Sequence, residues 1–386
     1  MNNSKKALVV TTVASTIDQF CMRNIRMLQG FGYQVEVAAN FQQGSTTSDS
    51  RIREFRQELS DMGVTVHDIG FQRSVTSLDN LRAYRQIRKI VRSGSYRLIH
   101  CHTPVGAMLV RLAARKERKK GTKVIYTAHG FHFFQGAPRK NWMLYYPVEK
   151  FCSRFTDAII TINHEDYELA RKKMKASRIF LIHGVGIDSR KIADLTVDRK
   201  GMRDALGVEQ DSFVVLCVGE LNQNKNHETV IRAIAQLKDP RVVCLIAGQG
   251  YLKESLEQLI DQLGLRGQVH LLGYRSDVLE LCHVADIFCF LSFREGLGVA
   301  ALEAMAAGLP LITSNIHGIN DYSQQGVTGF KTDPTDVQGV AKAMQSLRDD
   351  ENLRKKMGEY NQEKSLEYDF SRVDQEMETI YQELLA

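Results

Sequence analysis

The chain has 386 residues, which suggests two or three domains at about 150 residues each. Hydrophobic residues make up 43% and charged residues 25%, a composition that excludes a mainly disordered or collagen-like chain. No apolar run reaches the ~18 residues that a membrane-spanning helix needs. The 7 cysteines include no C-x-x-C pair, and Ala7–Ala14 reads as a buried strand rather than a signal peptide, so we expect a reduced, cytoplasmic protein.

The net charge of +6 is unevenly divided along the chain. Residues 1–190 carry 31 Lys and Arg against 15 Asp and Glu, a net +16, and residues 191–386 carry 20 against 30, a net −10. A basic first half predicts an anionic partner, such as a phospholipid surface, a lipid-linked phosphate or a nucleic acid. The sequence has no zinc-finger spacing, RNP-like strand or continuous basic region, so we expect no nucleic acid partner.

The first half alternates short apolar runs with helical stretches, which is typical of a doubly wound parallel sheet. Asp18–Gly30 and Leu81–Ser93 have apolar residues at helical spacing. The predicted strands are Ala7–Thr12, Gln34–Ala39, Thr65–Ile69, Leu98–His102, Lys123–Thr127, Ala158–Ile162 and a last strand within Ile179–Val185. We therefore place a first, Rossmann-like domain at residues 1–186.

The same pattern restarts after a polar stretch, Gly184–Arg203, that could hold a linker. The predicted strands are Phe213–Val218, Val242–Ala247, Val269–Leu272, Ile287–Leu291 and Leu311–Thr313, with helices between them. A second Rossmann-like domain follows at residues 187–370. Two helices are expected after Asp333, and the last, about 371–386, could pack back on the first domain. The sequence thus predicts the α/β class, with two doubly wound domains facing each other across a ligand-binding cleft.

A Gly-rich turn between a strand and a helix, from Ser292 to Pro310, carries the strongest chemical signal. A helix that starts near Gly298 would direct the backbone N–H groups of Gly298, Val299 and Ala300 at a bound anion. Glu295 and Glu303 flank that point, and carboxylates suit sugar hydroxyls better than phosphate. Phosphate at the helix end and diols at two carboxylates describe a nucleotide sugar. The alternative is a helix N-terminal charge at Glu303 and a solvated Glu295.

These residues resemble the E-x7-E motif of the family 4 glycosyltransferases, with the same Gly-x-Gly turn and the same following Glu-Ala-Met-Ala-x-Gly-x-Pro. The resemblance extends over nearly the whole chain, is strongest in its second half, and includes bacterial capsule and exopolysaccharide glycosyltransferases. It implies the GT-B fold and retaining transfer from a nucleotide sugar, such as a UDP-sugar, without a metal or other cofactor. It also implies that Glu295 lies against the transferred sugar and that Glu303 holds the ribose hydroxyls.

A second motif, from Val218 to Asn226, places Lys225 on a strand-to-helix loop where it could neutralise a phosphate. The family pattern has an arginine followed five positions later by a lysine. Lys225 matches the lysine, which implies a contact with the diphosphate, but Glu220 stands where the arginine is expected. Arg294 or Lys331 could supply the missing cation, or Glu220 could orient Lys225. The alternative for Lys225 is a surface lysine.

Two further loops follow strands of the second domain. Gly248 and Gly250 form a Gly-x-Gly turn before a helix, which is weak evidence for a nucleotide site and equally fits a plain tight turn. The resemblance places this turn beside the nucleotide. It also aligns the loop Gly273–Asp277, with Arg275, to the segment that contacts the base.

Four histidines of the first domain, His100, His102, His129 and His132, follow two predicted strands and would crowd together if those strands are neighbours. Their spacing fits no common zinc motif, so we do not expect a metal site. The segment from Thr127 to Gly130 matches a family segment whose histidine meets the donor sugar. The resemblance therefore assigns His129 to the sugar, and a satisfied loop histidine is the alternative.

The loop after the first strand lacks the Gly-Gly turn of many family members. We expect it to face the acceptor, which makes Thr16 and Asp18 candidate acceptor contacts. A helix-cap role is the simpler interpretation of Asp18.

Basic and aromatic residues of the first half would suit an anionic lipid surface. Leu81–Arg92 is an amphipathic helix with five cationic side chains, and seven aromatic residues lie between positions 131 and 151. A solvated charged face is the alternative. Enzymes that resemble this chain often act on lipid-linked acceptors, which favours a peripheral position at the inner face of the membrane.

The primary interpretation is a glycosyltransferase that moves a sugar from a UDP-sugar to a glycan or lipid-linked acceptor in cell-surface polysaccharide synthesis. A nucleotide-sugar epimerase of the same architecture is one alternative, and a non-catalytic sugar-nucleotide or lipid-binding protein is another. A dehydrogenase is disfavoured because the dinucleotide fingerprint is incomplete.

Overall fold

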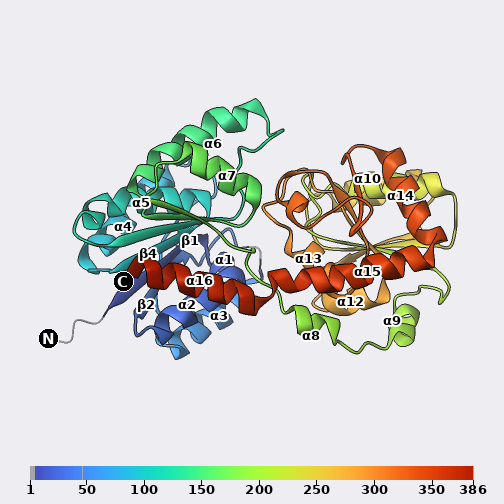
Figure 1. Ribbon diagram of the computed structural model, residues 1–386, viewed down its shortest axis with the longest axis horizontal. Coiled ribbons are helices and arrows are strands. Elements are labelled where there is room, and N and C mark those ends of the chain that lie inside the picture. Colours follow the sequence, from blue (N-terminus) through green and yellow to red (C-terminus); the bar gives the residue numbers. More distant parts are fainter. Residues whose placement is uncertain (1–4, 46, 386) are drawn as a thin grey trace. The chain divides into compact units, whose positions relative to one another are not determined.

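The computed structural model describes residues 5–45 and 47–385, which form two compact units. Unit 1 runs up to Gly184 and takes in the segment from Val373 on, and unit 2 is Val185–Arg372. Each unit is an open, all-parallel β-sheet covered by helices (Figure 1). The predicted α/β, Rossmann-like fold class is therefore confirmed. Over the described residues, no helix combines the length and the apolar character needed to cross a bilayer.

Unit 1 has a seven-stranded sheet with the order β3-β2-β1-β4-β5-β6-β7. The buried, β-branched runs of the sequence form its central strands, as expected where both faces of a sheet are covered. The order reverses between β1 and β4, and ligands of such sheets bind at the carboxyl ends of the strands beside a reversal. The strands are β1 (Lys6–Val13), β2 (Gln34–Asn40), β3 (Thr65–Asp68), β4 (Leu98–His102), β5 (Lys123–Ala128), β6 (Ala158–Thr161) and β7 (Arg178–Leu181).

The first helical region of unit 1 differs from the sequence expectation. The helix predicted at Asp18–Gly30 is two helices, which meet at Cys21, where the backbone departs from regular helical angles with φ −114° and ψ −7°. The helices are α1 (Ala14–Phe20), α2 (Met22–Gly30), α3 (Asp49–Asp61), α4 (Asp79–Ser93), α5 (Pro104–Arg118), α6 (Arg139–Cys152) and α7 (His164–Lys173).

The last helix, α16 (Phe370–Leu385), is tied to unit 1 by polar side chains. Its Asp374 accepts a hydrogen bond from Arg23 Nε at 2.9 Å, and Glu376 Oε1 lies 2.6 Å from His183 Nδ1. Tyr381 is fully buried, and its hydroxyl lies 2.7 Å from Nδ1 of the equally buried His100 in β4. The far end of the chain thus completes the core of the first unit.

Unit 2 has a six-stranded sheet with the order β10-β9-β8-β11-β12-β13, which reverses between β8 and β11. Five strands match the prediction, and the short β13 was missed. The strands are β8 (Phe213–Val218), β9 (Val242–Ala247), β10 (Val269–Gly273), β11 (Ile287–Phe290), β12 (Leu311–Ser314) and β13 (Gly329–Thr332).

The helices of unit 2 begin within the segment expected to hold the linker. Three helices follow Asp333 in the chain rather than the two predicted. The extra boundary lies at Asp350, whose side chain accepts a hydrogen bond from Leu353 N–H and so caps a new helix. The helices are α8 (Ser189–Ala193), α9 (Arg199–Ala205), α10 (His227–Leu237), α11 (Lys253–Gln262), α12 (Val278–Val284), α13 (Val299–Ala306), α14 (Val337–Asp349) and α15 (Glu351–Ser365).

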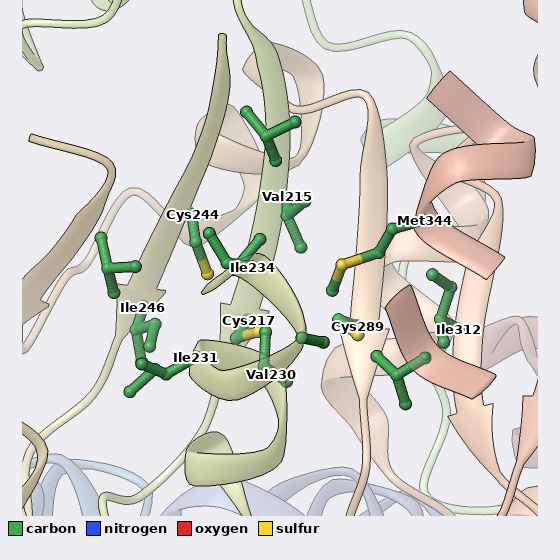
Figure 2. Packing of buried hydrophobic residues seen from close by; sticks show 14 of the residues in the cluster. Val215, Cys217, Val230, Ile231, Ile234, Cys244, Ile246, Cys289, Ile312 and Met344 are labelled. Carbon is green, nitrogen blue, oxygen red and sulfur yellow. The ribbon is translucent and has the colours of Figure 1, made fainter. Parts of the chain in front are cut away.

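The core of unit 2 lies between its sheet and the helices α10 and α14 (Figure 2). Val230, Ile231 and Ile234 of α10 pack over the thiols of neighbouring strands. All seven cysteines of the chain are free and buried, where they behave as small apolar side chains. This buried apolar core fixes the positions of the strand ends in unit 2. The loops that follow those strand ends carry the polar residues of the candidate site.

Candidate active site

The polar residues of unit 2 gather where its strand order reverses. Lys225 lies on the loop after β8, and Glu295 lies on the loop after β11. Lys225 Nζ is 2.5 Å from Glu295 Oε1 and 4.8 Å from the centre of the Phe290 ring. The structure therefore brings together two residues that the sequence separates by 70 positions, at the edge where open α/β sheets bind ligands.

The loops that carry this ion pair are joined by hydrogen bonds. Phe293 N–H donates to the carbonyl of Asn224 at 2.8 Å, and Asn224 Nδ2 donates to the carbonyl of Arg294 at 3.0 Å. Lys225 N–H donates to the side-chain oxygen of Asn222 at 3.0 Å. These bonds fix Lys225 and Glu295 on one rigid frame.

The start of α13 provides a positive helix end beside the ion pair. Gly298 has φ +96°, and a Cβ there would lie 2.6 Å from the Phe290 ring and 3.0 Å from the Tyr322 hydroxyl, so only glycine fits. The first helical bonds run from Ala301 and Leu302 to the Gly298 carbonyl. The preceding N–H groups, including those of Val299 and Ala300, therefore have no helical acceptor and form an electropositive end.

Glu303 lies one turn into α13. Burial raises the pKa of its carboxyl group from 4.5 to about 7. Among the described residues none is within hydrogen-bonding or ion-pairing distance of this carboxylate. A desolvated carboxylate without a protein partner is a strong acceptor for ligand hydroxyl groups.

The Gly-x-Gly loop after β9 is explained by close backbone packing. A Cβ at Gly248 would lie 1.9 Å from the Gly219 carbonyl oxygen, and one at Gly250 would lie 2.3 Å from the Leu221 carbonyl oxygen. Leu221 N–H donates to the carbonyl of Gln249 at 2.9 Å. Both glycines therefore fit the tight-turn alternative, in which they let this loop support the loop that carries Lys225.

Two other predicted donor-site residues have defined surroundings. Glu220 is exposed, and the ion pair that Lys225 makes is with Glu295. Arg275 follows β10, and its Nε donates to Asp277 Oδ1 at 2.7 Å. This neighbouring carboxylate partly neutralises the charge of Arg275.

Three of the four histidines in unit 1 come together. His100 and His102 in β4 have ring centres 4.2 Å apart, and His102 Nδ1 lies 3.0 Å from Nε2 of His129, which follows β5. Burial lowers the pKa of His100 to about 3 and that of His129 to about 4, so both are neutral at pH 7. His132 instead stacks on Tyr145. Within the described residues, no group of three or more His, Cys, Asp or Glu is arranged to hold a metal ion.

The predicted acceptor-side residues lie in α1. Asp18 is inside this helix rather than before it, so the helix-cap interpretation is wrong. Its carboxylate accepts two hydrogen bonds from Arg51, at 2.6 and 2.9 Å. Thr16 is half-buried, and its carbonyl accepts a weak bond from the Cys21 thiol. Asp18 is therefore held by α3 and does not present a free carboxylate.

Sequence reasoning missed the residues that surround the helix end. Tyr322 is fully buried, and within the described chain its hydroxyl has no hydrogen-bond partner. Phe290 lies between Gly298 and Lys225. Neither residue stands in a local motif, because both reach the site through the packing of the sheet.

Two Rossmann-like units, with an electropositive helix end and two glutamates after β11, have the architecture of the GT-B glycosyltransferases. Residues 198–364 match the family described as glycosyl transferases group 1, and residues 10–163 match the family described as glycosyl transferase 4-like. The chain belongs to the family 4 glycosyltransferases, as the E-x7-E motif predicted.

Several individual proteins resemble the chain over most of its length. EpsD of Bacillus subtilis, named as a glycosyltransferase, is 36% identical over 98% of this chain and 96% of its own. An Escherichia coli UDP-Gal:α-D-GlcNAc-diphosphoundecaprenol α-1,3-galactosyltransferase is 29% identical over 73% of this chain and 74% of its own. The crystal structure of Anabaena HepE with UDP has a TM-score of 0.79 at 21% identity, covering 98% of this chain and 100% of that one, which shows the shared fold.

Proposed function

We propose that the protein transfers a sugar from a UDP-sugar to a lipid-linked glycan, with retention of anomeric configuration, in the synthesis of a cell-surface polysaccharide. The single observation that carries this proposal is the Lys225–Glu295 pair at the start of α13. Two relatives support the substrate classes. The E. coli enzyme is named for UDP-galactose and a diphosphoundecaprenol-linked acceptor, and the Anabaena protein was crystallised with UDP and with UDP-glucose.

Lys225 and the helix end are assigned to the diphosphate of the donor. A diphosphate carries more negative charge than one carboxylate, so it would draw Lys225 away from Glu295. Glu295 would then be free to accept hydrogen bonds from the sugar hydroxyls. When the donor binds, Lys225 would move from Glu295 to the diphosphate, and Glu295 would bind the sugar instead. This exchange would orient the sugar and stabilise the leaving diphosphate.

Glu303 is assigned to the ribose, because its desolvated carboxylate can accept bonds from two vicinal hydroxyls. His129 of unit 1 is assigned to the transferred sugar. Val299 and Ala300 contribute backbone N–H groups to the phosphates, and Arg275 is assigned to the base. Gly248, Gly250 and Glu220 are assigned to the rim of this donor site.

We expect retention because the acceptor oxygen bonds to the anomeric carbon on the face that the diphosphate leaves, with no protein group as nucleophile. The bond from the anomeric carbon to the diphosphate breaks, and the leaving phosphate oxygen takes the proton of the attacking acceptor hydroxyl on the same face. Positive charge from Lys225 and α13 replaces the role that a metal has in other transferases. Undiminished turnover in the presence of EDTA is the expected result.

The test is transfer from a panel of UDP-sugars to an undecaprenyl-diphosphate-linked sugar, with NMR of the product to establish its anomeric configuration. Glu295→Gln and Lys225→Met should each lower kcat by about 100-fold or more while the fold persists. Glu359→Gln, on the exposed middle of α15, is the matched control and should keep full activity. Full activity of Glu295→Gln would overturn the assignment.

Two alternatives give different results in the same assay. An epimerase would convert the UDP-sugar without any acceptor, and a binding protein would retain UDP without turnover. Titration calorimetry with UDP, followed by product analysis without acceptor, separates both from a transferase.

We also propose that unit 1 docks on an anionic membrane surface from the cytoplasmic side. On α6, Leu144, Val148 and Phe151 are exposed at helical spacing, and Met143 beside them is 79% exposed. Lysines and arginines flank this stripe, and α4 adds a basic hollow of about 540 Å³ lined by Arg85, Arg88, Lys89, Arg92 and Ser93. Apolar side chains with surrounding cations suit an anionic lipid interface.

The test is sedimentation with vesicles of phosphatidylcholine, with and without phosphatidylglycerol. A Leu144→Glu and Phe151→Glu double variant should lose binding, whereas Leu366→Glu, an exposed leucine of unit 2, should not. Equal binding to vesicles that lack anionic lipid would contradict the proposal.

A further inference from the structure

His102 is a buried histidine whose position suits it to control another histidine. It ends β4, is 1% exposed, and lies between the ring of His100 and Nε2 of His129. His100 has both ring nitrogens occupied, because Tyr381 Oη is 2.7 Å from one and Thr127 Oγ1 is 2.8 Å from the other. His102 has only one nitrogen occupied, the Nδ1 that faces His129.

The second nitrogen of His102, Nε2, is buried and has no hydrogen-bond partner among the described residues. The imidazole of His102 is neutral, because burial and the neighbouring rings of His100 and His129 lower its pKa well below 6.5. A neutral imidazole carries one proton, either on Nδ1 or on Nε2. The two choices leave different groups unpaired at Nε2.

A proton on Nε2 would bury an N–H donor with nothing to receive it, and orphaned buried N–H groups are rare in folded proteins. A proton on Nδ1 is used in the bond to His129 and leaves only a bare lone pair at Nε2. We therefore infer that His102 is a positioning residue that donates from Nδ1 to Nε2 of His129, and thereby fixes the proton of His129 on Nδ1.

The turn after His102 keeps this geometry in place. Thr103 has φ +62°, which is unusual for a β-branched residue, and its hydroxyl lies 2.5 Å from the His102 carbonyl. Thr12 N–H donates to Thr103 Oγ1 at 2.9 Å, and Gly106 N–H donates to Thr12 Oγ1 at 3.1 Å. Strained backbone persists where its surroundings over-determine it, so these bonds hold the end of β4 in one conformation.

The chemical consequence concerns the free atom of His129. Its Nε2 is occupied, and its Nδ1 is neither buried nor hydrogen-bonded within the described residues. With its proton on Nδ1, His129 offers a bound ligand a hydrogen-bond donor and no lone pair. It can bind a sugar or phosphate oxygen but cannot take the proton of an acceptor hydroxyl, which leaves the donor's own phosphate oxygen as that base. The use of His129 on a sugar rests on the proposed function, whereas its protonation state does not.

The experiment is a long-range proton–nitrogen NMR spectrum of the full chain labelled with ¹⁵N-histidine, recorded at pH 7 without substrate. His102→Leu and His102→Asn assign the signals and test the effect. In the wild type, we expect His102 and His129 both to be protonated on Nδ1. Leucine removes the donor, so His129 should gain the Nε2-protonated form, whereas the amide of asparagine can donate in place of Nδ1 and should restore the wild-type signal.

Tyr381→Phe is the matched control, because it removes a hydrogen bond from His100 and leaves the His102–His129 bond intact. It should not change the signals of His129. In transfer assays, His102→Leu should lower kcat/KM by about three- to tenfold, the effect of one hydrogen bond, with recovery in His102→Asn.

A wild-type spectrum with His129 protonated on Nε2 overturns the inference, whatever the activity of the variants. The expected spectrum together with unchanged transfer by His102→Leu supports the inference and instead counts against the assignment of His129 to the sugar. If His102→Leu fails to fold, the wild-type and Tyr381→Phe spectra still decide the tautomer.

Discussion

Glu303 holds a carboxyl group that burial makes difficult to ionise. Its pKa rises from 4.5 to about 7 in the folded protein. Between these values the folded state keeps a proton that the unfolded chain releases, so stability falls as the pH rises through this window. Above pH 7, folding without a ligand buries the ionised carboxylate of Glu303. At 1.36 kcal/mol per pKa unit, this lowers the free energy of unfolding by about 3 kcal/mol as an upper limit.

Glu303→Gln removes that cost because the amide stays neutral. We expect the variant to match the wild type near pH 5 and to be more stable at pH 8, with a thermal midpoint up to about 6–12 °C higher at about 2–4 °C per kcal/mol. The same change should weaken UDP binding by about tenfold, because an amide is a weaker acceptor for ribose hydroxyls than a carboxylate. Stability and ligand affinity would thus move in opposite directions.

The assay is thermal unfolding of wild type, Glu303→Gln and the exposed control Glu359→Gln across pH 5–8, with and without UDP. The control should show no pH-dependent difference from the wild type. A midpoint shift of Glu303→Gln that is the same at pH 5 and pH 8 would refute the reasoning.

Three other predictions concern the framework. Glu149→Ala should lower the free energy of unfolding in urea by about 3–5 kcal/mol, because it leaves the buried charge of Arg111 without its ion-pair partner. The double variant Arg111→Met, Glu149→Leu should regain most of that stability. An equal loss in the single and the double variant would contradict this. Gly248→Ala should prevent unit 2 from folding, because the added Cβ would lie 1.9 Å from a backbone atom, and the native circular dichroism signal should be lost. Gly30→Ala is the control: the space around Gly30 is open, so this change should be neutral or slightly stabilising. Tyr381→Phe should lower the free energy of unfolding by about 1–3 kcal/mol by leaving a buried ring nitrogen unpaired, and an unchanged urea midpoint would be inconsistent with that bond.

The sequence was most informative where residues act through local periodicity. The apolar runs around Val215 and Ile125 predicted central strands because both faces of those strands are covered. The strand Gly329–Thr332 was missed because it is short, starts with glycine and is half-polar. It exists because β12 offers a free edge for its residues to pair with.

The candidate site followed from sequence only where a motif was contiguous. The start of α13 at Gly298, with Glu303 one turn into the helix, was predicted correctly. The histidine cluster was predicted as a consequence of neighbouring strands, and the pairing of β4 with β5 confirms that condition. The partner of Asp18 could not be predicted, because Arg51 lies 33 residues away and reaches it only through the packing of α3 beside α1.

Unit 1 is completed by residues that the ribosome makes only after the whole of unit 2. The whole of unit 2 lies in the chain between Gly184 and the segment from Val373 on. At roughly 5–20 residues per second, translation of that stretch takes on the order of 10–40 s. During this interval the imidazole of His100 lacks its hydrogen bond to Tyr381. Unit 2 is contiguous in the chain, so its hydrophobic core can form in the meantime. The first unit to emerge is therefore the last to mature, and a nascent chain stalled before Val373 would expose the unfinished core of unit 1 to chaperones and proteases.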